Sequence, residues 1–139
     1  MPPPAMPSGD PDLVLAALRD ADAPSRWSLH DWERWLGQAR RADLTGRLAA
    51  RLAADGRLDA VPAAPARHLR IALQVGETHR REVLRELQAV DEALASLGAP
   101  VVLLKGAAYL AAGLPPAAGR RFSDVDLLAA REVLAQAEE

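Results

Sequence analysis

Two aspartates separated by one residue, Asp124 and Asp126, are the side chains in this sequence best suited to chemistry. Residues 123–129 alternate polar and apolar and then become wholly apolar, which predicts a β-strand. Residues two apart on a strand share a face, so the two carboxylates would lie side by side, about 6–7 Å apart at Cα, with Val125 on the opposite face. Carboxylate oxygens on a rigid strand suit a hard divalent cation such as magnesium.

A segment upstream of the aspartates has features suited to binding phosphate. Residues 101–104 form a short branched apolar run, which predicts a strand buried on both faces. A helix is predicted to follow from Ala107 to Ala112. Gly106 lies between them, and its lack of a side chain would let the turn approach a phosphate that also meets the free amides of the helix.

Basic and hydroxyl side chains flank both segments. Lys105 and either Arg120 or Arg121 could neutralise the charge of a triphosphate. A purely structural interpretation stays open for each residue. Gly106 could be an ordinary turn glycine, the basic side chains could extend into solvent, and Ser123 could cap the turn into the strand.

Together these residues resemble the nucleotidyltransferase superfamily, and more narrowly a group of uncharacterised bacterial nucleotidyltransferases with a helical N-terminal region. The superfamily pattern is a hydrophobic residue, Gly, and Gly or Ser at a first turn, followed by Asp-hydrophobic-Asp on the next strand. Residues 104–107 match the turn in part, because Ala107 stands where a phosphate-binding hydroxyl often lies. The Asp124-Val125-Asp126 segment matches the metal strand fully, with Arg120 in the upstream arginine position.

The resemblance implies transfer of a nucleoside monophosphate from a nucleoside triphosphate (NTP) to an unknown acceptor hydroxyl. It implies that Asp124 and Asp126 are catalytic and hold two Mg²⁺ ions. It further implies that the nucleotide is bound by residues of the turn and of the loop: Lys105, Gly106, Arg120 and Ser123.

The superfamily also takes a third carboxylate from a later strand. The sequence stops at Glu139, and Glu132, Glu138 and Glu139 follow a helical pattern that makes them unsuitable ligands. The catalytic set is therefore expected to be incomplete. A second interpretation stays open, in which the chain is a truncated or degenerate helical interaction module or half of a split enzyme. An open two-stranded sheet would then pair with a second copy or with a complementary chain.

The predicted fold class is α+β, with a helical N-terminal region that leads by a long helix into the first two strands of a nucleotidyltransferase-like sheet. Trp32, Trp35 and Leu36 define an apolar helix face, and Ser28 with Asp31 forms a predicted capping box. We expect four regions: a disordered leader over residues 1–10, a helical subdomain over 11–60, a connecting helix over 61–98 and a partial α/β core over 99–139.

Composition limits the functional classes. The formal net charge of −2 argues against a nucleic-acid partner. The absence of cysteine excludes disulfides and thiolate metal sites. No apolar run approaches the roughly 20 residues of a membrane helix, and the N-terminus lacks the pattern of a signal peptide, so a cytoplasmic location without membrane contact is expected. His30, His68 and His79 have no ligand spacing and are not predicted to be catalytic.

Overall fold

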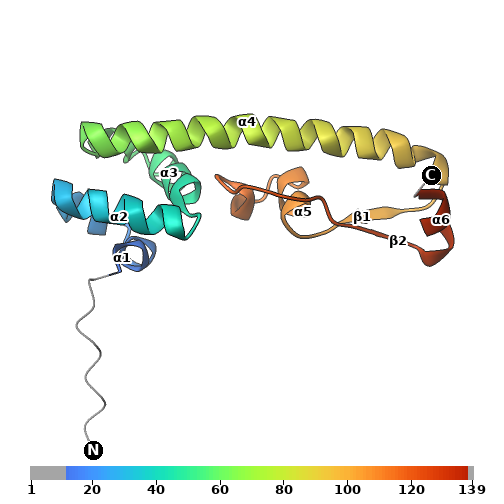
Figure 1. Ribbon diagram of the computed structural model, residues 1–139, viewed down its shortest axis with the longest axis horizontal. Coiled ribbons are helices and arrows are strands. Elements are labelled where there is room, and N and C mark those ends of the chain that lie inside the picture. The colour runs from blue at the N-terminus through green and yellow to red at the C-terminus, as the bar shows by residue number, and fades with distance from the viewer. Residues whose placement is uncertain (1–11, 138–139) are drawn as a thin grey trace, which may run out of the picture.

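The computed structural model describes residues 12–137 and contains an N-terminal group of helices that one long helix joins to a small α/β unit (Figure 1). The leader predicted over residues 1–10 lies outside the described residues. The helices and strands are α1 (Leu13–Arg19), α2 (Leu29–Arg41), α3 (Thr45–Ala54), α4 (Ala63–Leu94), β1 (Val101–Leu103), α5 (Lys105–Ala111), β2 (Leu127–Ala129) and α6 (Leu134–Ala137). Short 3₁₀ turns occupy Ala23–Arg26, Leu58–Ala60, Ala95–Leu97, Pro115–Ala117 and Arg131–Val133.

The N-terminal core forms around two tryptophans of α2. Trp32 and Trp35 are 2% and 1% exposed, and their rings meet edge to face with centroids 5.4 Å apart. Trp27 packs against both rings, with centroid distances of 5.1 and 5.9 Å. Edge-to-face packing of this kind adds to the free energy gained from burying the rings. The predicted apolar face of α2 is therefore confirmed as core.

The start of α2 has the predicted capping box. The Ser28 hydroxyl oxygen accepts a hydrogen bond from the Asp31 backbone N–H at 3.2 Å, and an Asp31 carboxylate oxygen accepts one from the Ser28 backbone N–H at 3.0 Å. Hydrogen bonds from the Ser28 side chain and backbone hold the pKa of Asp31 below its ordinary value. Two amides that a helix start leaves without helical partners are thereby satisfied.

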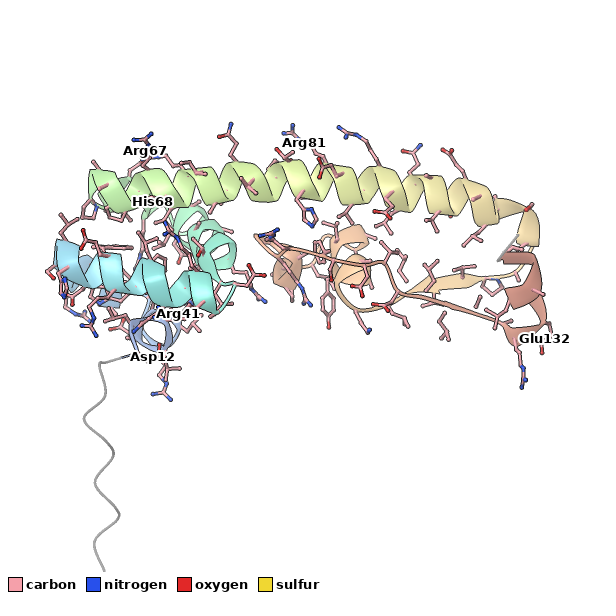
Figure 2. All side chains as sticks on the ribbon, in the orientation of Figure 1. Asp12, Arg41, Arg67, His68, Arg81 and Glu132 are labelled. Carbon is pink, nitrogen blue, oxygen red and sulfur yellow. The ribbon has the colours of Figure 1, made fainter. Side chains whose placement is uncertain are left out.

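The long helix α4 connects the two cores. Its 32 residues span roughly 48 Å at the usual rise of 1.5 Å per residue. Leu69 is buried in the N-terminal core, whereas Val83 and Leu87 are buried in the C-terminal core. Arg67 and Arg81 project from the opposite side of the helix (Figure 2). The predicted α+β class is confirmed, and no described helix has both the length and the apolarity needed to cross a bilayer.

β1 and β2 pair as an antiparallel two-stranded sheet. Val102 lies directly opposite Leu128, and these side chains are 50% and 57% exposed. The prediction that residues 101–104 form a strand buried on both faces is therefore wrong. The reason is that α4 lies along only one face of the sheet, and no other described element covers the exposed pair.

The strand predicted over residues 123–129 is also shorter than expected. Only Leu127–Ala129 pairs with β1, because β1 itself ends at Leu103 where the chain turns into α5. The helix predicted from Ala107 begins two residues earlier, at Lys105. The two aspartates consequently precede the strand, in an extended segment that enters it.

Two glycines bring the N-terminal helices into direct backbone contact with the loop that precedes the aspartates. A Cβ placed on Gly46, near the start of α3, would lie 2.5 Å from the carbonyl oxygen of Gly119. Gly119 itself has a φ of +65°, in the left-handed region that favours glycine. Gly76 of α4 also faces Gly119, although a Cβ there would lie 4.0 Å from the Gly119 Cα, which is an ordinary contact distance.

This geometry predicts opposite effects for two substitutions of the same type. Gly46→Ala should lower the free energy of unfolding by roughly 1–3 kcal/mol, because the added methyl meets backbone that cannot move aside. Gly76→Ala should leave it unchanged or raise it by about 1 kcal/mol, because alanine favours a helix interior. Urea denaturation of both variants measures the difference. Equal effects would contradict the backbone contact between Gly46 and Gly119.

Candidate active site

The aspartate pair lies beside the end of β1. The Leu104 backbone N–H donates a hydrogen bond to the Asp126 carbonyl at 2.9 Å, which fixes the extended segment against the turn into α5. Val125 packs against the C-terminal core. Asp124 is exposed, and the Asp126 side chain is 32% exposed. Both carboxylates can therefore be reached from solvent while the backbone between them is held in place.

Lys105 is a basic residue that the structure brings to one of the aspartates, Asp126. Its Nζ atom lies 3.1 Å from an Asp126 carboxylate oxygen. Lys105 also has a φ of +53°, a left-handed conformation that costs a non-glycine residue about 1–2 kcal/mol. Strained backbone of this kind concentrates at functional sites. The sequence pointed to Lys105 by its charge, but it contained no indication of this conformation.

Ser123 contacts an aspartate directly, whereas Arg120 contacts the nearby Phe122 ring. The Ser123 hydroxyl donates to an Asp124 carboxylate oxygen at 3.2 Å. The Arg120 guanidinium lies 5.8 Å from the centroid of the Phe122 ring, within the range of a cation–π contact. Arg121 is exposed and lines a groove beside α3. Of the two arginines considered for phosphate binding, Arg120 is therefore the one held by a defined contact within this loop.

Gly106 is buried beneath an aromatic ring. A Cβ on Gly106 would lie 2.5 and 2.6 Å from two carbons of the Phe122 ring. Any side chain at this position would therefore displace Phe122. The sequence predicts either a phosphate contact or an ordinary turn role for Gly106. The structure shows in addition that its missing side chain makes room for the Phe122 ring.

Sequence reasoning missed His79 of α4. Its Nε2 atom accepts a hydrogen bond from the Phe122 backbone N–H at 2.9 Å, and its ring stacks on Phe122 with a centroid distance of 6.1 Å and an interplanar angle of 18°. One signal could have identified it. Apolar residues and Gly76 recur every three or four positions along the inward face of α4, except between Gly76 and Val83. His79 lies at the position on that face where the next apolar residue would be expected.

Comparison with protein families decides the classification. The profile of a family described as "Uncharacterised nucleotidyltransferase" matches residues 28–139. The protein belongs to this nucleotidyltransferase family. The matched range begins at the capping residue of α2, so the family signature includes the helical region as well as the α/β unit. No curated protein and no solved structure matches the chain.

The two carboxylates of this family member have the chemistry to bind a divalent cation, although they form a small donor set. Asp124 and Asp126 offer the carboxylate oxygens that magnesium prefers, and both are accessible to solvent. Asp126 already faces the Lys105 ammonium group, so a cation would compete with that ion pair. Within residues 12–137, no group of three or more histidine, aspartate or glutamate side chains converges as a metal site.

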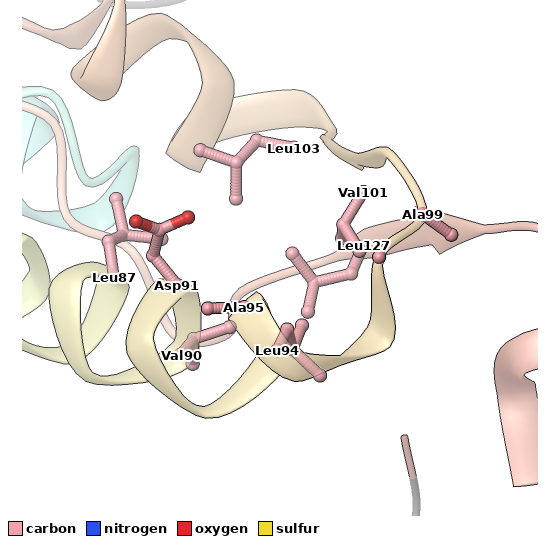
Figure 3. A pocket seen from close by; sticks show the side chains of 10 residues that line it. Leu87, Val90, Asp91, Leu94, Ala95, Ala99, Val101, Leu103 and Leu127 are labelled. Carbon is pink, nitrogen blue, oxygen red and sulfur yellow. The ribbon is translucent and has the colours of Figure 1, made fainter. Parts of the chain in front are cut away.

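Two grooves of the protein lie away from the aspartates. The groove between α4 and the sheet, about 310 Å³, is lined mostly by aliphatic side chains, and Asp91 is the charged residue among its described lining residues (Figure 3). A larger groove of about 510 Å³ lies between α4, α5 and the loop after α5, and it is lined by Arg80, Glu77 and Arg120. Neither groove is lined by Asp124 or Asp126.

The left-handed conformation of Lys105 predicts a difference between two variants that both remove the ion pair. Lys105→Gly should be more stable than Lys105→Ala by about 1 kcal/mol, because only glycine adopts a positive φ without a steric cost. Lys105→Ala itself should lose less than about 1 kcal/mol of ion-pair energy, since the Lys105 side chain is 70% exposed. Urea denaturation checks the order. An alanine variant as stable as the glycine variant would contradict the observed backbone conformation.

Proposed function

We propose that this protein transfers a nucleoside monophosphate from an NTP to an acceptor hydroxyl. The observation that supports this function best is the attachment of the acid pair to the turn at Lys105. Asp126 is joined to that turn twice, by the hydrogen bond from Leu104 and by the ion pair with Lys105. Membership of a nucleotidyltransferase family gives the reaction class.

In this proposal Asp124 and Asp126 hold the magnesium ions. When bound, the ions would neutralise phosphate charge and stabilise the attacking and leaving oxygens of the transfer. Asp124 needs little rearrangement to take part, because its carboxylate is exposed and its hydrogen-bond partner is the adjacent Ser123. Asp126 contributes from a more fixed position, since its own carbonyl is bound to Leu104.

Lys105 acts on the nucleotide. Its ammonium group balances the Asp126 carboxylate in the free protein, and a phosphate oxygen is an equally suitable anionic acceptor. Because the Lys105 side chain is largely exposed and flexible, it can move from the carboxylate to the triphosphate as the nucleotide arrives. Arg120, which lies against the Phe122 ring, supplies a second positive charge. Ser123 completes the nucleotide contacts, and Gly106 lets the turn pack beneath Phe122.

Isothermal titration calorimetry tests this function. We expect the heat of NTP binding to the wild-type protein to depend on the presence of Mg²⁺. The Asp124→Asn/Asp126→Asn double variant should lose this heat, because the amides no longer offer anionic oxygens to the cation.

Asp91→Asn is the matched control, since Asp91 is an exposed acid of α4 outside the site. It should bind as the wild type does. Equal magnesium-dependent heats from the wild type and the double variant would contradict the function.

A further inference from the structure

We propose that His79 is a positioning residue, which fixes Phe122 and thereby holds the acid pair and the Gly106 turn in their binding arrangement. The effect on Phe122 follows from geometry alone. The effect on cation binding rests on the function proposed for Asp124 and Asp126, so the two parts need separate measurements.

His79 fixes both the backbone and the ring of one residue. Its Nε2 atom accepts the Phe122 N–H at 2.9 Å, and the two rings stack at an angle of 18°. A backbone N–H can only donate, so Nε2 must carry the lone pair and the imidazole proton must lie on Nδ1. Because α4 is a long, regular helix packed into both cores, His79 is a rigid attachment point.

Phe122 connects His79 to both halves of the site. Its ring fills the space above Gly106, where an added Cβ would lie 2.5 Å away, and it supports the Arg120 guanidinium. Its backbone continues directly into Ser123 and Asp124. A shift of Phe122 therefore changes the turn that meets the nucleotide and the segment that carries the carboxylates.

The loop before the acid pair is held at two points. Gly119 lies against the backbone of Gly46 in α3, and Phe122 is bound by His79 of α4. The three-residue spacing between Gly76 and His79 places both on one face of α4, so one helix face meets both ends of the loop. Loss of the His79 contact would remove the hydrogen bond and the ring stacking that fix Phe122. Asp124 would then be held less firmly on its Phe122 side, while Val125 and Asp126 keep their own contacts.

The first measurement follows the Phe122 amide by NMR hydrogen exchange. We expect slow exchange in the wild type and clearly faster exchange in His79→Ala. His79→Gln should restore much of the protection, because the glutamine amide oxygen can accept the same hydrogen bond without the stacked ring. His68→Ala is the matched control, since His68 is an exposed histidine of α4 that contacts Arg40 instead.

The second measurement uses Mn²⁺ as the probe and follows paramagnetic broadening of the Asp124 and Asp126 amide signals. Residues that orient metal ligands change metal affinity by roughly 10-fold or more, so His79→Ala should weaken Mn²⁺ binding by about that factor. His79→Gln should recover part of the affinity, and His68→Ala should match the wild type. If the alanine variant does not fold, His79→Phe takes its place, because phenylalanine keeps a ring against Phe122 but cannot accept the Phe122 N–H. Its Phe122 amide should also exchange faster than that of His79→Gln, and it should bind Mn²⁺ more weakly than His79→Gln.

The outcomes separate the two parts of the proposal. Unchanged exchange at Phe122 in both His79 variants would overturn the positioning role. Faster exchange with unchanged Mn²⁺ affinity would overturn the link from His79 to the acid pair. If the wild type shows no Mn²⁺ broadening at Asp124 and Asp126, the cation site of the proposed function fails together with that link, and the exchange result alone decides the role of His79 toward Phe122.

Discussion

The contact between Gly46 and Gly119 is the constraint on which the rest of the structure depends. Backbone meets backbone there at a distance that no side chain would allow. The contact brings the N-terminal helices against the loop that leads to the acid pair, so the helical region is part of the surroundings of the site. The family match, which begins in that helical region and continues through the α/β unit, agrees with this arrangement.

The side chains along α4 contact both cores and the loop between them. One end of the helix is buried with the tryptophans of α2, and the other covers the inner face of the sheet. Between them, His79 takes the place of an apolar residue and binds Phe122. A polar side chain at this point can satisfy a backbone amide that an aliphatic side chain would leave without a partner. The same helix therefore supports the core and orients the loop.

Features set by neighbours in sequence could be predicted, whereas features set by distant contacts could not. The spacing of Trp32 and Trp35 and the pairing of Ser28 with Asp31 act within one or two helical turns, so the sequence pattern was sufficient. The apolar run at residues 101–104 correctly indicated a strand, but no local pattern says how many faces a neighbouring helix will cover. The left-handed Lys105 and the contact of His79 with Phe122, 43 residues away, depend on the assembled fold.

Phe122 is held between Gly106 and His79, directly before the two aspartates. Nuclear Overhauser spectroscopy of the labelled protein can detect both contacts. We expect cross-peaks from the Phe122 ring protons to the Gly106 Hα protons and also to the His79 ring protons. A Phe122 ring with cross-peaks to neither residue would rule out this arrangement, because the loop and the aspartates would then lack the support described.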